Sequence, residues 1–171
     1  LLGDKYLSKS RGQTLLIDEN IAEKIAELLE CPPGNKELEI GPGLGIITEK
    51  LIEKGYSVVG VEIDEFFCEY LREKNVEVIN RDFLQMEINR DFPDKIVGAL
   101  PFSVSVKILT KILSNRNFFT NWVVVLQKEV AERITASPGS KKYSSLSIVF
   151  QISYNINFEF EISPNSFFPR P

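Results

Sequence analysis

The sequence predicts an α/β fold in which helices alternate with the strands of a mostly parallel sheet. Three observations support this prediction. Short apolar runs alternate with segments of helical spacing along most of the chain. The first run enters a loop with glycine at every second position, Gly41 to Gly45, and helical spacing resumes directly after it. The second run ends in a carboxylate, Glu62. Alternation of this kind places helices on the faces of a parallel sheet.

The composition suits one ordinary domain. A chain of 171 residues buries roughly 70% of its unfolded surface, so it needs no covalent cross-link. Cys31 and Cys68 have the spacing of neither a metal site nor a disulfide framework. No apolar run approaches the ~18 residues of a membrane span, and the first residues lack the apolar core of a signal peptide. We therefore expect a soluble protein of the cytoplasm, without a membrane span or a metal.

The N-terminal part leads into the first helix. Residues 1–17 form a basic segment with a net charge of +2. Asp18 is a typical helix N-cap, because apolar residues follow it at helical spacing until Pro32 and Pro33 stop them. This helix is expected to pack one face on the core.

The glycine loop is the centre of the prediction. Glycine adopts backbone angles that other residues resist, and without a Cβ it lets the main chain approach a ligand beside a helix N-terminus. The helix after the loop is expected to end at Gly55, a left-handed C-cap. Residues 57–62 form the next strand, and Glu62 stands where such sheets place the acid that binds ribose hydroxyls.

Two cofactors use this geometry. The dinucleotide fingerprint requires its third glycine one position later, where Ile46 stands. S-adenosylmethionine has no pyrophosphate, so it does not need that glycine. The residues favour S-adenosylmethionine over NAD.

Two further strands end near the same edge of the sheet. Asp64 is expected to cap a helix, and residues 76–79 form a short strand followed by Asp82, which could accept from the adenine amine or simply cap a turn. Residues 95–100 form another strand, which runs into Pro101 and Phe102. An exposed aromatic there is a stacking platform for a base, although Phe102 could instead be core. Ser103 or Ser105 is expected to cap the next helix.

The last third of the chain completes the sheet. Residues 121–126 predict a buried strand, and residues 127–136 a helix. After a polar loop, residues 146–154 and 156–162 have strand character and are expected to form an antiparallel pair. The organisation expected is a catalytic domain over 18–163 and the start of a linker over 164–171.

The charge is unevenly distributed. Residues 18–94 have a net charge of −11, whereas residues 95–142 have eight Lys/Arg against two Asp/Glu, a net charge of +6. The basic half therefore suits a nucleic acid, unless its charges are ordinary solvated helix faces.

These residues together resemble the rRNA adenine N6-dimethyltransferases, which include the bacterial small-subunit dimethyladenosine transferases and the erythromycin-resistance methylases. The resemblance runs from Gly12 to Pro171. It lies in six motifs in the family's order: residues 12–18, 39–45, 61–64, 99–102, 126–133 and 139–147, with 167–171 leading into the family's C-terminal part. Residues 127–130 and 139–143 resemble the ribosome-assembly enzymes more than the resistance methylases.

The resemblance implies a class I methyltransferase fold, a Rossmann-like sheet of seven strands with an antiparallel edge, and S-adenosylmethionine as the methyl donor. The family's small helical C-terminal domain is not in this sequence. The resemblance also implies a monomer that dimethylates two adjacent adenosines near the 3′ end of small-subunit rRNA in a pre-ribosomal particle. The catalytic loop would be Ala99, Leu100, Pro101 and Phe102. The cofactor would contact Gln13, Thr14, Leu16, Gly41, Gly43, Glu62, Ile63, Asp82, Phe83 and Ala99, and the RNA would contact Lys107, Lys128, Arg133, Lys141 and Lys142.

Ala99 departs from the family pattern. The family usually has asparagine there, whose side-chain oxygen accepts from the target amine, and alanine keeps only the backbone carbonyl. Losing one such acceptor typically lowers a rate by about 10²–10³. A slowed enzyme is therefore expected, and a ribosome-assembly factor that binds without catalysis and a resistance-type enzyme acting on large-subunit rRNA are the alternatives.

Overall fold

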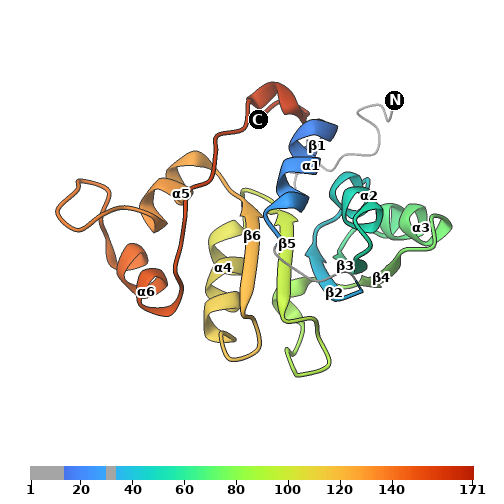
Figure 1. Cartoon of the computed structure of the whole chain (residues 1–171), viewed down its shortest axis with the longest axis horizontal. Helices are drawn as coiled ribbons and strands as arrows, with labels where there is room; N and C mark the ends of the chain where they lie inside the picture. The colour runs from blue at the N-terminus through green and yellow to red at the C-terminus, as the bar shows by residue number, and fades with distance from the viewer. Residues whose placement is uncertain (1–13, 30–33) are drawn as a thin grey trace.

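The computed structural model describes residues 14–29 and 34–171, and its centre is a five-stranded sheet (Figure 1). The strand order is β4-β3-β2-β5-β6, and every neighbouring pair is parallel. The strands are β2 (Lys36–Ile40), β3 (Ser57–Glu62), β4 (Glu77–Asn80), β5 (Lys95–Ala99) and β6 (Asn121–Val125). The predicted α/β class with a parallel sheet is confirmed.

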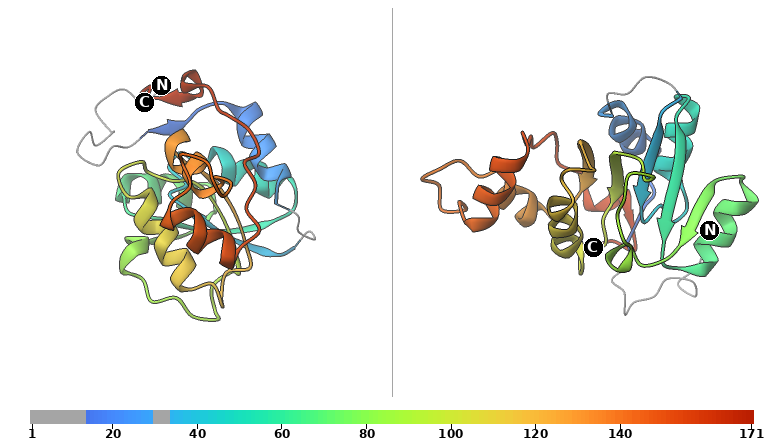
Figure 2. Two further views of the ribbon diagram at one scale, coloured as in Figure 1. Left: turned by 90° about the vertical axis from the view of Figure 1, so that its left-hand side faces the viewer. Right: turned by 90° about the horizontal axis from the view of Figure 1, so that it is seen from below.

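Helices cover both faces of this sheet. One core cluster joins one face to α1 (Glu19–Glu27) and α2 (Ile46–Glu53), and another joins the opposite face to α4 (Ser105–Ser114) (Figure 2). Adjacent residues of β5 show the division, because Ile96 belongs to the α4 cluster and Val97 to the α1–α2 cluster. The other helical elements are α3 (Glu65–Glu73), α5 (Lys128–Ile134), α6 (Ser145–Ser153) and the 3₁₀ turns η2 (Phe83–Gln85) and η3 (Pro164–Ser166).

A second, two-stranded sheet joins the two ends of the described chain. Strand β1 (Leu15–Leu16) pairs antiparallel with β7 (Phe167–Phe168). The Ser166 hydroxyl donates to the Asp18 carboxylate over 2.8 Å. Residues 166–168 therefore pack against the segment that leads into α1, while the domain boundaries at 17 and 163 stay predictions.

The predicted caps are mostly confirmed. Asp18 caps α1 by accepting from the backbone N–H groups of Asn20 and Ile21, and Asp64 caps α3 by accepting from Phe66 N–H. Gly55 follows α2 with φ +85°. The prediction for α4 was wrong, because its N-cap is Val104 and Ser105 is its first residue. The Ser105 hydroxyl instead donates to the Phe102 carbonyl.

The predicted antiparallel pair at 146–154 and 156–162 is wrong. Residues 145–153 form helix α6, and residues 155–163 form neither helix nor strand. Leu146, Phe150 and Tyr154 are spaced by four residues, so a helix places them on one side, and all three pack against the α4 cluster. The rings of Phe150 and Tyr154 contact Trp122 of β6 edge to face. Of the seven strands expected in one sheet, the described residues place five in the central sheet, and the antiparallel pair is instead β1–β7, a separate sheet formed by other residues than those predicted.

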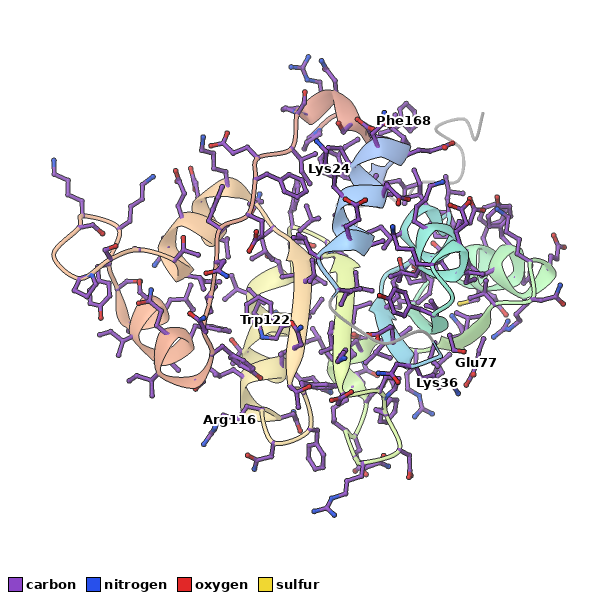
Figure 3. The ribbon with its side chains drawn as sticks, in the orientation of Figure 1. Lys24, Lys36, Glu77, Arg116, Trp122 and Phe168 are labelled. Atoms are coloured by element: carbon purple, nitrogen blue, oxygen red, sulfur yellow. The ribbon has the colours of Figure 1, made fainter. Side chains whose placement is uncertain are left out.

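The two ends of the sheet differ in character. At the start of β2, Lys36 reaches across β3 to Glu77 on β4, with 2.8 Å between Nζ and Oε2 (Figure 3). The carboxyl ends of the strands carry the glycine loop and most of the other predicted site residues. Strand β6 forms one edge of the sheet, and its residues are half-buried rather than buried as expected.

Two absences hold for the described ranges. Within residues 14–29 and 34–171, no helix has the length and apolar character needed to cross a membrane. In the same ranges, no three His, Cys, Asp or Glu side chains group in a way that could hold a metal ion.

Gly98 sets the close approach of β5 to β2. A Cβ at this position would lie 2.4 Å from the Ile40 carbonyl oxygen, which is backbone and cannot move aside alone. A Cβ on Gly60 would come no closer than 3.1 Å, and its nearest neighbour is the side chain of Pro42. Gly98 therefore fixes how β5 presents the loop that follows it.

We expect Gly98→Ala to lower the free energy of unfolding by about 1–3 kcal/mol or more, because the strands must separate locally. Urea denaturation measures this loss. Gly60→Ala is the matched control and should cost less, since the Pro42 ring can shift. Equal losses in the two variants would contradict this account of the β5–β2 contact.

Glu39 is a buried carboxyl beneath α2. The Thr48 hydroxyl donates to its Oε2 over 2.5 Å, and both side chains are at most 1% exposed. Burial raises the pKa of Glu39 to about 7, against the lowering by the Thr48 hydrogen bond, and the Glu62 carboxylate raises the pKa further. The folded state therefore favours the protonated form.

Because the pKa of Glu39 rises from 4.5 to about 7 on folding, its contribution to stability is complete below pH 4.5 and is lost as the pH rises through 7. In Glu39→Gln this dependence is absent. We expect the free energy of unfolding of the wild type to fall relative to the variant by up to about 1.4 kcal/mol per pH unit in this window. Urea denaturation at several pH values checks this. Parallel curves of the free energy of unfolding against pH for the two proteins would contradict it.

Candidate functional site

The glycine loop turns sharply from β2 into α2. Gly41, Gly43 and Gly45 have φ angles of +68°, +55° and +80°, in the left-handed region where glycine carries no steric cost. Gly45 is the N-cap of α2, and the Gly41 N–H donates to the Val61 carbonyl of β3. The backbone conformation therefore explains why each of the three positions of the sequence motif is glycine.

Glu62 joins the glycine loop to the end of β3. Its Oε2 accepts from the Gly43 N–H over 3.1 Å, and its Oε1 accepts from the Asp64 N–H over 2.9 Å. Burial raises the pKa of Glu62, while the hydrogen bonds from Asp64, Gly43 and Ile63 lower it. A carboxylate has about four acceptor sites, so Glu62 keeps capacity for a ligand hydroxyl.

Asn80 braces the end of β3 from the neighbouring strand. Its side-chain amide donates to the Glu62 carbonyl over 3.1 Å and lies 3.2 Å from the Cys68 sulfur of α3. Sequence reasoning missed this residue. It stands directly at the end of a predicted strand, where a side-chain amide can indicate a residue of the candidate site. Asn80 thereby ties Glu62 to both β4 and α3.

Strand β1 lies over the glycine loop. A Cβ on Gly43 would come within 2.8 Å of Leu15 Cδ2, so glycine is needed there for contact as well as for conformation. Leu16 is buried and Thr14 half-buried. Sequence reasoning named Thr14 and Leu16 but not Leu15, and Gln13 lies outside the described residues.

The loop after β5 lies beside the glycine loop. Pro101 Cδ would be 4.0 Å from a Cβ on Gly41. The Leu100 N–H donates to the Val125 carbonyl, and Leu100 is 2% exposed. Ala99, Pro101 and Phe102 are half-buried, so the Phe102 ring is not wholly taken into the core. The structure thus places the predicted catalytic loop next to the predicted cofactor loop.

Asp82 stands at the end of β4, on the side of Glu62 away from β2. Its Oδ1 caps η2 by accepting from the Leu84 N–H over 2.9 Å. Phe83 is buried in the α4 cluster with 4% exposure, and Ile63 is exposed. A ligand at this edge would therefore meet the Asp82 carboxylate and the Ile63 side chain, and only the backbone of Phe83.

The predicted RNA-contacting residues fall into two groups, all five of them exposed. Lys128 pairs with Glu161 over 2.6 Å, and Lys142 pairs with Glu132 over 2.5 Å. Lys107, Arg133 and Lys141 form no ion pair within the described residues. Their charge is therefore fully available to an anionic partner.

The chain is similar in sequence and in structure to known proteins. The chain is 40% identical over 171 residues to ribosomal RNA small subunit methyltransferase A of Malacoplasma penetrans, covering 97% of this chain and 62% of that protein. It is 36% identical over 176 residues to the protein of the same name from Pediococcus pentosaceus, covering 95% and 59%. The chain thus spans about three fifths of the length of these relatives.

Two solved structures are also similar. A dimethyladenosine transferase from Plasmodium falciparum matches with a TM-score of 0.77 and 27% identity over 92% of this chain and 59% of that chain. The 23S rRNA methyltransferase ErmE matches with a TM-score of 0.62 and 33% identity over 73% and 52%. The family model described as ribosomal RNA adenine dimethylase matches residues 5–171. The chain therefore belongs to the ribosomal RNA adenine dimethylase family.

Proposed function

We propose that residues 18–163 form the catalytic domain of an S-adenosylmethionine-dependent rRNA adenine N6-dimethyltransferase. The substrate is two adjacent adenosines near the 3′ end of small-subunit rRNA. The enzyme acts as a monomer on a pre-ribosomal particle in the cytoplasm. Membership of the ribosomal RNA adenine dimethylase family and similarity to small-subunit methyltransferases support this choice of substrate over large-subunit rRNA.

One observation carries the proposal. The Glu62 carboxylate holds the Gly43 N–H, and the Pro101 side chain of the neighbouring loop lies beside Gly41. A cofactor seated on the glycine loop is therefore within reach of the loop that would hold a target base. Methyl transfer needs this proximity, because holding two reactants in place supplies much of the rate enhancement.

The described residues fit an adenosyl cofactor. Glu62 would accept from the ribose hydroxyls with its remaining lone pairs, and Asp82 from the adenine amine with Oδ2, which accepts no hydrogen bond within the described residues. Thr14 and Leu16, on the strand that covers the loop, would flank the methionine moiety. When bound, S-adenosylmethionine supplies an electrophilic methyl group on its sulfonium.

The loop at 99–102 would orient the target adenine. The N6 lone pair is delocalised into the ring, so acceptors for the amine hydrogens must direct it toward the methyl group. The Leu100 backbone carbonyl is one such acceptor, and Phe102 would stack on the flipped base. Leu100 is nearly buried, so the dry surroundings strengthen this hydrogen bond.

The basic residues would contact the RNA backbone. Lys107 lies in the first turn of α4, close in sequence to the 99–102 loop, whereas Lys141 and Lys142 lie in the loop between α5 and α6. The ion pairs of Lys128 and Lys142 are solvent-exposed and therefore weak, so a phosphate can displace the carboxylate.

Transfer of labelled methyl groups from S-adenosylmethionine to unmethylated small ribosomal subunits tests the proposal. We expect the full-length protein to transfer methyl groups, and Ala99→Asn to transfer them about 10²–10³ times faster, because asparagine adds a side-chain acceptor for the target amine. Large subunits, which should accept none, are the control substrate.

Each other outcome has a distinct meaning. Failure of both proteins to transfer methyl groups, while they still bind cofactor and particle, would contradict the proposal and favour an assembly factor without catalysis. Transfer to large subunits alone would favour a resistance-type enzyme. Equal rates for the two proteins would contradict the role in catalysis that is assigned to the side chain at position 99.

A further inference from the structure

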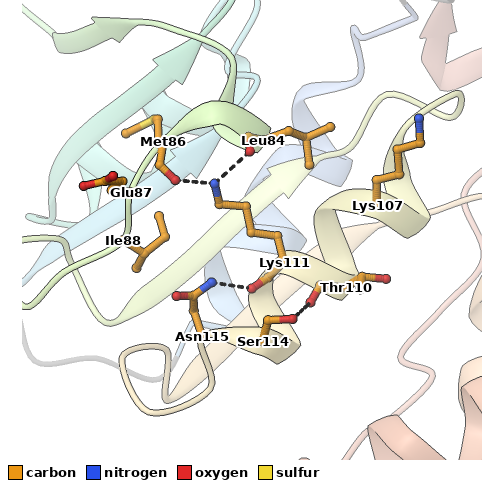
Figure 4. Close-up of a pocket in the computed structure, with 9 residues that line it drawn as sticks. All are labelled: Leu84, Met86, Glu87, Ile88, Lys107, Thr110, Lys111, Ser114 and Asn115. Atoms are coloured by element: carbon orange, nitrogen blue, oxygen red, sulfur yellow. Dashed lines mark hydrogen bonds between the residues drawn. The ribbon is translucent and has the colours of Figure 1, made fainter.

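Lys111 connects α4 to the turn that follows Asp82. Its Nζ donates to the Leu84 carbonyl over 3.0 Å and also to the Met86 carbonyl (Figure 4). The same amine lies 5.3 Å from the centre of the Phe83 ring. A single side chain from α4 therefore contacts Phe83 and Leu84 of η2 and Met86, the residue that follows the turn.

The turn η2 is held at both ends. At its start, Asp82 Oδ1 accepts from the Leu84 N–H and the Asp82 carbonyl accepts from the Gln85 N–H. At its end, the last carbonyls of a helix have no partner within the helix, and Lys111 supplies one. The direction of the Asp82 carboxylate therefore depends on a turn that Lys111 closes.

The position of Lys111 is costly for a lysine. Burial lowers the pKa of its ammonium, while the Asp82 carboxylate raises it. Among the described residues, the hydroxyls of neighbouring Thr110 and Ser114 donate only to carbonyls of α4 and do not reach the turn. The two hydrogen bonds to backbone carbonyls offset the partial desolvation of the ammonium. The arrangement therefore indicates that Lys111 holds these carbonyls in place.

We propose that Lys111 is a positioning residue for the adenine end of the cofactor site, an inference that rests on the proposed function. By holding the Leu84 and Met86 carbonyls, it keeps the η2 turn in the form that directs Asp82 at the adenine amine. Helix α4 begins three residues after Phe102, so the helix behind the target-base loop also supports the turn that reads the cofactor.

The surroundings of Lys111 make the inference testable by substitution. The side chain lies on the wall of an open surface cavity of about 670 Å³ between α4 and residues 84–88 (Figure 4). A shorter or neutral side chain at this position can be hydrated or follow the same wall, so its replacement opens no closed void. The hydrogen bonds to the turn are what the replacement removes.

The test compares two probes that differ only at the adenine amine, S-adenosylhomocysteine and its 6-deamino analogue with purine in place of adenine, by titration calorimetry. Wild-type protein should prefer the adenosyl compound, because only its amine can donate to Asp82. In Lys111→Met and Lys111→Gln this preference should shrink by roughly fivefold, the effect of one ordinary hydrogen bond. Lys111→Arg, which can donate to two carbonyls, should retain most of it.

Ser114→Ala is the matched control, because Ser114 lies on the same helix and the same cavity wall. It should leave the preference unchanged. If Lys111 had a merely structural role, its replacement would weaken the binding of both probes equally. An unchanged preference in either folded neutral variant would overturn the inference but leave the proposed function standing. Failure of the wild type to bind S-adenosylhomocysteine would instead overturn the proposed function, and the inference with it.

Discussion

The hydrogen bond from the Gly43 N–H to the Glu62 carboxylate is the constraint on which the site depends. It fastens the loop after β2 to the end of β3, and the same carboxylate accepts from the first backbone groups beyond β3. Asn80 holds the Glu62 backbone from β4, and Leu15 covers the loop from β1. A buried carboxylate is costly unless hydrogen bonds satisfy it, so Glu62 and the loop stabilise each other. The result is a preformed surface at the position where the proposed function requires the cofactor.

Much of the fold could be predicted from the sequence, because its signals are local. Asp18 and Asp64 cap helices as expected, since a carboxylate before an apolar helical pattern satisfies backbone N–H groups wherever it occurs. Helix α6 was predicted as strand, because a short apolar run fits both periods and only the packing of Phe150 and Tyr154 on Trp122 decides between them. The β1–β7 pair was not predicted, because two-residue strands leave no pattern and their partners are far apart in sequence.

Some residues of the candidate site could likewise be predicted from the sequence and others could not. Gly41, Gly43, Glu62 and Asp82 were predictable, because parallel strands bring their carboxyl ends to one edge and the residue types there are unusual. Asn80, Leu15 and Lys111 were not, because each acts through a contact with backbone or loop that only the tertiary structure defines. Lys111 was instead counted within a basic segment expected to face RNA, whereas its amine donates to the carbonyls of Leu84 and Met86. Net charge by segment therefore indicates a partner but does not assign individual lysines.

The central claim is that Glu62 and the glycine loop form an adenosyl-cofactor site. Calorimetric binding of S-adenosylhomocysteine to the wild type, Glu62→Gln and Glu65→Gln tests it most directly, with circular dichroism to verify folding. Glu65 is the control, because it lies three residues away and is exposed. The account predicts that the wild type and Glu65→Gln bind alike and that Glu62→Gln binds at least about tenfold more weakly, since a hydrogen bond to a charged acceptor is lost. Equal binding by all three proteins, or no binding by the wild type, would contradict it.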